Sequence, residues 1–341
     1  MKKYQYLILI LVFLLLISIN ICVQGSPLQV LIATSGAASS GNFRSQTVWN
    51  IINKYIPEII VGSLVETGGS YDEANRVGIL KEVQIGEQTA MGALQELYSG
   101  TGKFTEPHPE LRMLYGIVLG LYTFCVRTAE NINKIEDLDG KKYNEGPPGS
   151  GEEVLTKMAL DALGIKPKYG SSSVADAAIM MKNRQIAGYT KFTTADSLDS
   201  SMMDISTTQD ITWIGFTKEQ TEKISGVNPL LYWYEVKKNT VRELPDVNGW
   251  FIAGINVGFA TEELPQKVVY HMVKSMFEHL DEIIAAYPKW AFGIGKTVED
   301  QMNLFAGYEG LPPMHAGVIQ YWEELGLDIP VKLIPSDYVK N

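Results

Sequence analysis

Short aliphatic and β-branched runs alternate with amphipathic helical patterns along most of the chain. Residues 28–34 predict a first strand, and the helical pattern at 43–55 ends before Pro57. A second strand at 59–65 leads into another helix after Ser70. This alternation predicts an α/β fold with a mostly parallel sheet covered by helices. Ligands of such sheets bind beyond the carboxyl ends of the strands.

Two longer apolar stretches, residues 111–126 and 250–260, flank a middle segment that holds a strand and helix set of its own. We expect each stretch to carry the chain from one lobe to the other. The prediction is lobe 1 over residues 26–122 and 251–341, and lobe 2 over residues 123–250. A ligand would lie in the cleft between them. Further on, an apolar stripe predicts a single helix over 266–287.

The first 25 residues have the pattern of a secretory signal peptide. Lys2 and Lys3 precede an apolar run at 7–17, and Gly25 ends a segment that suits a signal peptidase. A retained membrane anchor is the alternative, because residues 7–23 nearly reach spanning length. Bulky Ile21 argues against a lipoprotein site at Cys22. No later run could span a bilayer, so we expect a soluble extracytoplasmic protein, in the periplasm or on the outer face of the membrane.

Charge and chemistry narrow the function further. The chain has 39 acidic and 29 basic residues and a net charge of −10, which repels nucleic acid and anionic lipid. Removal of the signal leaves Cys125 as the single cysteine, and the four histidines are dispersed. We find neither HExxH nor GxSxG, nor any other catalytic spacing. We therefore expect a monomeric binding protein without metal or cofactor, rather than an enzyme.

Three loops of small residues precede helices at predicted strand ends: residues 35–42, 67–70 and 145–151. Ser70 with Glu73, and Ser150 with Glu153, have the spacing of a capping box. Exposed N–H groups and the helix dipole at such positions attract a carboxylate. An ordinary capped helix after a glycine-rich turn is the alternative for each loop alone. Together the three loops predict a cradle for a carboxylate or amino acid.

Four segments, in order, resemble the TAXI family of solute receptors that serve TRAP (tripartite ATP-independent periplasmic) transporters. The resemblance covers nearly the whole chain after the signal. Its motifs are TGGS at 67–70, IEDLDGKK at 135–142, GPPGSG at 146–151, and PMHAGV at 313–318 with Tyr321 and Glu324 behind it.

The resemblance implies a type II periplasmic-binding (Venus-flytrap) fold, a TRAP membrane permease as partner, and a ligand of the glutamate, 2-oxoglutarate or dicarboxylate kind. Gln88 matches a polar position on the helix after the third strand, and residues 188–191 match a cleft-lining stretch of lobe 2. Carried over by motif position, the ligand contacts are Ser35, Gly36, Gly41, Asn42, Phe43, Thr67, Gly68, Gly69, Ser70, Gln88, Gly149, Ser150, Gly151, Glu152, Tyr189 and Lys191, and Arg44 next to the first loop is added to them as a candidate counter-charge. Phe43 or Tyr189 would cover the ligand.

The chain departs from the family pattern at two places. GNFR stands at 41–44 where members commonly have Gly-Thr-Tyr-Tyr, and Glu152 and Glu153 follow the GSG where a threonine is usual. The two carboxylates either point away from the cleft or face a positive group on the ligand. Arg44 and Lys191 are candidate counter-charges, with a solvated surface position as the alternative for each. The rival functions are a receptor for an ABC importer or sensor kinase, and an enzyme on the same fold.

Overall fold

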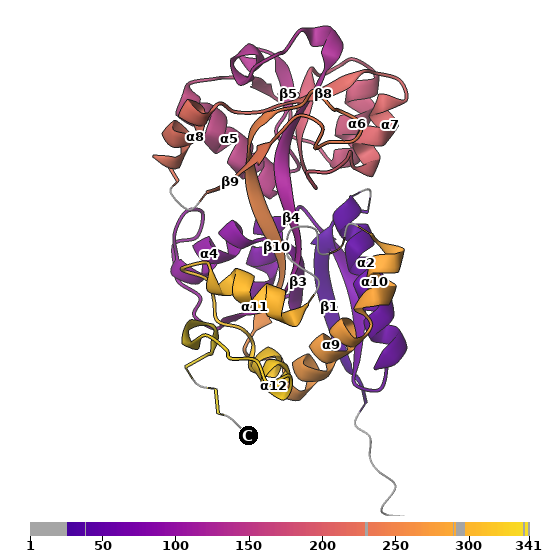
Figure 1. Cartoon of the computed structure of the whole chain (residues 1–341), viewed down its shortest axis with the longest axis vertical. Helices are drawn as coiled ribbons and strands as arrows, with labels where there is room; N and C mark the ends of the chain where they lie inside the picture. Colours follow the sequence, from indigo (N-terminus) through magenta and orange to yellow (C-terminus); the bar gives the residue numbers. More distant parts are fainter. Residues whose placement is uncertain are drawn as a thin grey trace, which may run out of the picture.

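The computed structural model describes residues 26–37, 39–228, 231–288, 290, 297–336 and 338–339. The predicted signal peptide, residues 1–25, lies outside the described residues. The described chain has a lower half and an upper half joined by two long strands (Figure 1). We call the lower half lobe 1 and the upper half lobe 2. Within the described part, every helix falls short of the length and apolar character that a bilayer crossing requires.

Lobe 1 begins with parallel strands and the helices that follow them. β1 pairs in parallel with both β2 and β3. The predicted alternation of strand and helix is confirmed, with α2 starting earlier than expected because Ser39 caps it. The elements are β1 (Leu28–Ser35), α2 (Ser40–Tyr55), β2 (Ile60–Thr67), α3 (Ser70–Ala74), a π-helical turn (Asn75–Ile79), β3 (Ile85–Ala90) and α4 (Met91–Ser99).

Lobe 2 repeats the pattern on a smaller scale. β5 pairs in parallel with β6 and β7, and helices pack around these strands. Two 3-10 turns, Thr128–Glu130 and Ile135–Leu138, lead into it. The elements are β5 (Lys142–Asn144), α5 (Gly151–Leu163), β6 (Lys168–Tyr169), α6 (Val174–Lys182), β7 (Gly188–Thr193), α7 (Ser200–Ser206), β8 (Ile211–Ile214) and α8 (Lys218–Ser225).

Two strands, β4 (Leu111–Arg127) and β10 (Gly249–Thr261), run through both lobes as predicted (Figure 1). β4 pairs with β10 up to Gly120, which faces Gly254, and with β7 from Leu121 onward. The partner of β4 therefore changes at residue 120, close to the expected lobe boundary at 122. The boundaries themselves stay a prediction.

The described strands form one sheet in the order β2-β1-β3-β10-β4-β7-β5-β6, with β8 on β4 and β9 (Tyr232–Val236) on β10. The prediction of a mostly parallel sheet is wrong for the crossing strands. β10 is antiparallel to β3, β4 and β9, and β4 is antiparallel to β7 and β8. The reason is topological: the chain leaves lobe 1 along β4 and returns along β10, so the two strands point in opposite directions.

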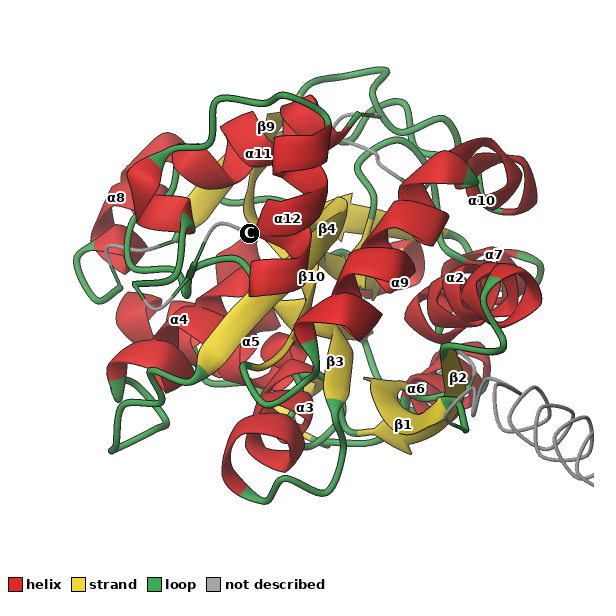
Figure 2. Cartoon of the chain, turned by 90° about the horizontal axis from the view of Figure 1, so that it is seen from below, coloured by secondary structure: helices red, strands yellow, loops and turns green. Residues whose placement is uncertain are grey.

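The C-terminal helices cover lobe 1. Figure 2, which views the molecule from below, shows α9 and α12 side by side in front of the strands, and Gln266 of α9 donates to Gln320 of α12 (2.9 Å). The single helix predicted over 266–287 is wrong, because His279 leaves the helical conformation (φ −114°, ψ 23°) and divides it. The elements are α9 (Gln266–Glu278), α10 (Leu280–Ala286), α11 (Val298–Ala306), α12 (Ala316–Glu324) and a 3-10 turn (Val331–Leu333).

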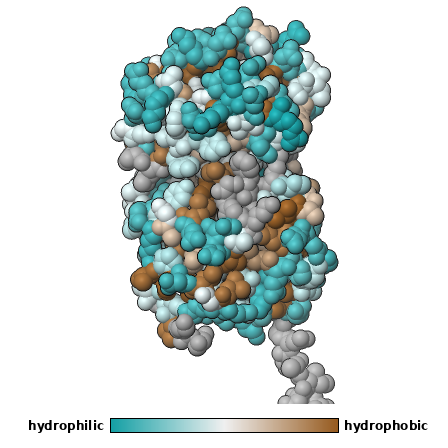
Figure 3. Space-filling view, viewed as in Figure 1, coloured by the Kyte–Doolittle hydropathy of each residue, from teal (hydrophilic) through white to brown (hydrophobic). Residues whose placement is uncertain are grey.

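A continuous hydrophobic core extends through both lobes. Trp49 and Trp322 are fully buried in lobe 1, and Tyr143 and Tyr189 are fully buried in lobe 2. On the face seen in Figure 3, lobe 2 presents mostly hydrophilic residues, and hydrophobic residues gather from the waist downward. The interior of each lobe is filled by this core. We therefore look for polar groups that can contact a ligand at the junction between the lobes.

Candidate anion-binding site

A pocket at the junction of the lobes is lined by residues from both. Its lobe 1 side is formed by the carboxyl ends of β1 and β3, the loop after β2 and the start of α2. Its lobe 2 side is formed by α5 and β7. Its lining is Ser35, Ser39, Ser40, Gly41, Arg44, Gly69, Ser70, Gln88, Tyr122, Glu152, Lys191, Phe192 and Asn256. We call it the inner pocket.

The N-terminus of α2 opens into the inner pocket without an acidic side chain of its own. Ser39 caps the helix by accepting a hydrogen bond from the Gly41 amide (3.0 Å), and its hydroxyl shares a hydrogen bond with Ser35 Oγ (2.7 Å). The first turn holds no acidic residue. The partial positive charge of a helix N-terminus therefore stays uncompensated beside the pocket.

Arg44 is a buried cation in the same pocket and is only 4% exposed. Its Nη2 donates to Gln88 Oε1 (2.8 Å) and its Nη1 to the Tyr287 hydroxyl (3.4 Å). Its Nε has no hydrogen-bond partner among the described residues, and no carboxylate there lies within 4.0 Å of the guanidinium. A buried charge without a counter-ion is costly, so this position favours an anion.

Gln88 fixes the guanidinium of Arg44. Its Oε1 also accepts from Asn256 Nδ2 (3.3 Å), and its Nε2 donates to Ser45 Oγ (3.2 Å). All of its side-chain atoms are therefore engaged, which holds the amide in one orientation. Neighbouring Ser70 accepts from the Ala90 amide (2.9 Å) and joins the loop after β2 to the end of β3.

The lobe 2 side of the pocket contains both signs of charge. The ammonium of Lys191 lies 3.7 Å from Glu152 and 4.0 Å from Asp199. Glu152 also accepts from the Phe192 amide (3.3 Å), whereas Glu153 turns toward Lys157 (2.8 Å). Of the two carboxylates that follow the GSG, Glu152 therefore faces the cleft and Glu153 points away from it.

The two glycine-rich loops meet directly across the junction. The amides of Tyr71 and Asp72 donate to the carbonyl of Gly149 (3.2 and 3.3 Å). A Cβ built on Gly68 would lie 2.4 Å from the carbonyl oxygen of Pro148. Close backbone contact of this kind requires the lobes to be in a closed arrangement.

Two buried carboxyl groups lie beneath the inner pocket. Glu73 accepts from the Gln88 amide (2.9 Å) and the Thr89 hydroxyl (2.8 Å), and burial raises its pKa to about 7. Glu87 accepts from Trp49 Nε1 (2.7 Å), and burial raises its pKa to about 8. Desolvation of the charged form is the cause in both cases. These groups tie β3 to the surrounding elements.

The structure places eight of the predicted site residues in the inner pocket. Phe43 lies outside it, in an adjoining pocket at the cleft mouth, and Gly151 lines a different pocket. The remaining predicted residues do not line the inner pocket. They are Gly36, Asn42, Thr67, Gly68, Gly149, Ser150 and Tyr189. The eight inside are Ser35, Gly41, Arg44, Gly69, Ser70, Gln88, Glu152 and Lys191.

Several expected roles differ from the structure. Tyr189 is buried in lobe 2 with its hydroxyl on Ser201 Oγ (2.9 Å), so it does not cover the inner pocket. Gln88 lies on β3 rather than on the following helix. Ser70 does not cap α3: Gly69 is the N-cap and makes no side-chain cap hydrogen bond.

The prediction that the glycine-rich loops offer unpaired amides is wrong for four residues. Gly68 N donates to Asp72 Oδ2 (2.9 Å), and Gly69 N to Thr67 Oγ1 (3.2 Å). In lobe 2, Gly149 N donates to Glu153 Oε2 (2.8 Å), and Ser150 N to the Pro147 carbonyl (3.1 Å). Ser150 does cap α5, since it accepts from the Glu153 amide (3.1 Å). The loops thus bind their own side chains, and α2 with Arg44 remains the anion-attracting element.

Some lining residues were missed from the sequence. Tyr122 and Phe192 pack against each other at the floor in a tilted arrangement, with ring centroids 5.0 Å apart and 59° between the ring planes. Each sits in a strand whose pattern resembles ordinary core. Asn256 did carry a signal, because it is a polar residue inside the apolar stretch at 250–260. Ser39 and Ser40 belong to the small-residue loop and carried no separate signal.

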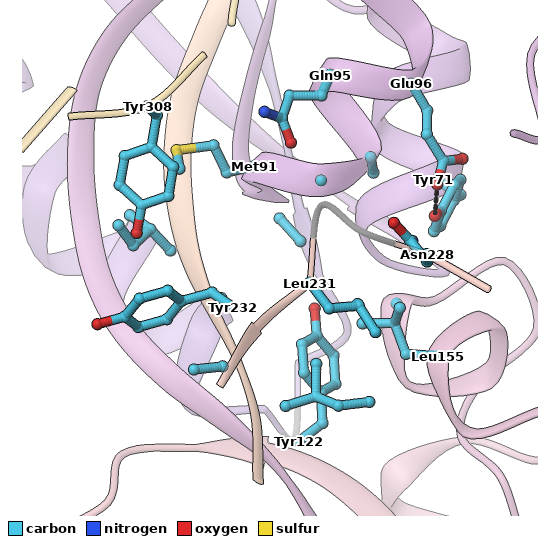
Figure 4. A pocket seen from close by; sticks show the side chains of 18 residues that line it. Tyr71, Met91, Gln95, Glu96, Tyr122, Leu155, Asn228, Leu231, Tyr232 and Tyr308 are labelled. Carbon is cyan, nitrogen blue, oxygen red and sulfur yellow. Dashed lines mark hydrogen bonds between the residues drawn. The ribbon is translucent and has the colours of Figure 1, made fainter. Parts of the chain in front are cut away.

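A second pocket lies between the lobes and shares only Tyr122 with the inner pocket. Figure 4 shows its tyrosines Tyr71, Tyr232 and Tyr308 with Leu155 and Leu231 around it. The Tyr71 hydroxyl donates to Glu96 (3.0 Å). Of the lining residues that the structure describes, Glu96 is the one acidic residue and none is basic. The pocket therefore lacks the cation that distinguishes the inner pocket.

No metal site emerges from the described residues, which contain no group of three or more potential His, Cys, Asp or Glu ligands. The Cys125 thiol is fully buried in β4, and burial raises its pKa well above the ordinary value. A buried thiol of this kind is a poor nucleophile.

Comparisons with known proteins agree with this architecture. A family model described as the NMT1-like family matches residues 33–326. The periplasmic binding protein BugD aligns with a TM-score of 0.53 at 13% identity over 89% of this chain and 99% of BugD. MatC from Rhodopseudomonas palustris, solved with bound malate, aligns with a TM-score of 0.51 at 11% identity over 77% of this chain and 89% of MatC. No curated protein is significantly similar in sequence. The predicted two-lobed Venus-flytrap fold is confirmed.

Proposed function

Because the chain belongs to the NMT1-like family and has a two-lobed binding-protein fold, we propose that it is an extracytoplasmic solute receptor. It binds a small organic anion or amino acid between its lobes and performs no chemistry on it. The mature protein acts outside the cytoplasm after export by its N-terminal signal peptide. The resemblance to TAXI receptors adds a TRAP membrane permease as the partner that accepts the ligand.

One observation carries the proposal: Arg44 is buried in the inner pocket without a carboxylate partner in the described part of the chain. Buried arginines are ordinarily paired, because an isolated charge in a low-dielectric site is unfavourable. A ligand carboxylate would supply the missing charge and accept bidentate hydrogen bonds from the guanidinium. The adjacent N-terminus of α2 would add to the attraction.

The contacts across the junction explain how binding would close the lobes. The inner pocket draws its lining from both, so a ligand makes its full set of contacts only when the lobes are together. The direct contact of the 67–70 loop with the 148–150 loop then seals the cleft. The closed receptor presents a defined surface to the permease.

A thermal-shift and calorimetric screen of amino acids, dicarboxylates and 2-oxo acids tests the proposal. At a hundredfold excess of ligand over Kd, binding stabilises the fold by about 2.7 kcal/mol. Arg44→Met keeps the volume of the side chain but removes its charge. We expect this variant to lose the ligand-induced shift while its free form stays as stable as the wild type, since an unpaired buried charge is removed.

Arg242→Met is the matched control, because the Arg242 side chain is 74% exposed and does not line the inner pocket. It should bind like the wild type. A panel without any ligand-induced shift, or an Arg44→Met variant that binds as well as the wild type, would contradict the proposal. Neighbouring genes test the partner: a large polytopic permease supports the TRAP assignment, and an ATPase supports an ABC importer.

A further inference from the structure

The inner pocket adjoins a second chamber. Both are lined by Ser39, Ser40 and Arg44, so the guanidinium lies at their boundary. We call the second chamber the outer pocket. Its remaining lining is Ala37, Phe43, Thr193, Thr194, Leu198, Asp199, Ser200, Met203 and Tyr287. A ligand held by Arg44 can therefore extend from one pocket into the other.

The charges of the two pockets restrict the ligand. Their linings hold two cations, Arg44 and Lys191, and two carboxylates, Glu152 and Asp199. Lys191 lies near both carboxylates, at 3.7 and 4.0 Å. Among the described residues, Arg44 is thus the one lining cation without a carboxylate partner, and it can neutralise one ligand carboxylate. A second carboxylate would face Glu152 and Asp199 and be repelled.

The lobe 2 side has an excess of negative charge over Lys191, which favours a positive group on the ligand. Asp199 Oδ1 accepts from the Met202 amide (2.9 Å) and the Ser201 hydroxyl (2.8 Å) as the cap of α7. Its Oδ2 is buried and has no hydrogen-bond partner among the described residues. Thr194 Oγ1, in the same lining, is also buried without one. A ligand ammonium would satisfy Asp199 while its carboxylate satisfies Arg44.

The outer pocket offers an apolar surface from both lobes. Phe43 of lobe 1 is 51% exposed and Met203 of lobe 2 is 47% exposed, although both are large hydrophobic residues. Phe43 packs against Tyr287 with ring centroids 5.9 Å apart, and Leu198 completes the wall. Exposed hydrophobic residues on the two walls of a ligand cleft favour an apolar ligand group between them.

We propose that the receptor selects a zwitterionic α-amino acid with a large apolar side chain, in preference to glutamate, 2-oxoglutarate or another dicarboxylate. This inference rests on the proposed function and adds the substrate class. The carboxylate lies on Arg44 and the N-terminus of α2, the ammonium faces Asp199 and Glu152, and the side chain lies between Phe43 and Met203.

Isothermal titration of the purified protein with L-phenylalanine, L-leucine, L-glutamate, phenylpyruvate and 2-oxoglutarate tests the proposal. We expect phenylalanine and leucine to bind at least tenfold more tightly than glutamate and 2-oxoglutarate, because, unlike those two, they bury an apolar side chain and add no second carboxylate. Phenylpyruvate, which lacks the ammonium, should bind more weakly than phenylalanine.

Two variants separate the contribution of the ligand ammonium from that of the apolar side chain. Asp199→Asn keeps a good cap for α7. It should weaken the binding of phenylalanine about tenfold and leave the binding of phenylpyruvate unchanged or tighter. Met203→Ser should weaken the binding of phenylalanine several-fold more than the binding of glutamate. Tighter binding of glutamate or 2-oxoglutarate, abolished by Arg44→Met, would overturn this inference and leave the receptor function standing. Absence of binding by every compound would overturn both.

Discussion

Replacing Gly68 with alanine places a methyl group against the opposite lobe. The new Cβ would lie 2.4 Å from the Pro148 carbonyl oxygen, which belongs to the backbone and cannot rotate away. Forcing an extra methyl group into such a contact costs about 1–3 kcal/mol. The residue has no positive φ, so alanine fits the local backbone when the lobes are apart. The penalty therefore falls on the closed arrangement alone.

Because closure is part of binding, this penalty lowers the apparent affinity for the ligand. A cost of about 1–3 kcal/mol corresponds to a Kd that is roughly 5-fold to 150-fold weaker. Gly68 does not line the inner pocket, so the loss cannot come from a missing ligand contact. Calorimetry measures the affinity, and small-angle scattering with and without ligand reports whether the lobes still close.

Gly170→Ala serves as the control for the Gly68 variant. A Cβ at Gly170 has no neighbour within 4 Å, and its φ is not positive. Its affinity should match that of the wild type, and both variants should unfold at the wild-type temperature without ligand. Wild-type affinity in Gly68→Ala would refute the argument that contact between the two loops belongs to the bound state.

Two further predictions concern the fold of lobe 1. Burial raises the pKa of Glu87 to about 8, so the folded chain keeps a proton that the unfolded chain releases above about pH 4.5. The free energy of unfolding therefore falls as the pH rises from about 4.5 to about 8, by up to about 1.4 kcal/mol per pH unit. In urea denaturation, Glu87→Gln should show a smaller difference in the free energy of unfolding between pH 5 and pH 8 than the wild type does. An equal difference in variant and wild type would contradict the raised pKa of Glu87. Gly86→Ala should lower the unfolding temperature, because its Cβ would lie 2.1 Å from the Phe259 ring, at a cost of about 1–3 kcal/mol. Gly92→Ala, with no atom within 4 Å, is its control, and equal loss in both would refute the packing argument.

The sequence predicted the architecture well because its signals are local. The apolar stretches at 111–126 and 250–260 correspond to β4 and β10, and the alternation of strands and helices is as expected. The direction of pairing was not accessible in the same way. It depends on β4 and β10 running opposite ways beside each other, which the apolar pattern alone does not specify.

The site was predicted in part, for a physical reason that differs from loop to loop. Gln88, Glu152 and Lys191, which were carried over by motif position, line one pocket. Arg44, a candidate counter-charge at a departure from the family pattern, lines the same pocket. The amides of the glycine-rich loops are occupied, because Asp72 and Glu153 reach back to them from the following helices. Nothing in the spacing of a capping pattern tells whether an acidic side chain will bind its own loop or point toward the cleft.

Contacts between site residues that lie far apart in the sequence were the hardest to predict. Tyr122 and Phe192 meet only because β4 pairs with β7 beyond residue 120. Asp199 is the cap of α7, and its spare oxygen matters only because Lys191 and the outer pocket are next to it. Such relations depend on tertiary structure, and no short pattern in the sequence encodes them.

The pairing of Gly120 with Gly254, at the point where β4 changes partner, has a consequence for how selectivity arises. The strands carry no side chains there, so the rotation axis of the two lobes should pass near this pair. Atoms close to an axis sweep a short arc, and the aromatic floor of Tyr122 and Phe192 lies directly over it. Phe43 and Met203 line opposite walls of the outer pocket and not the inner pocket, so rotation of the lobes changes the distance between them. The charged end of a ligand would thus be held in nearly constant geometry, while the size of its other end determines how completely the two lobes can close.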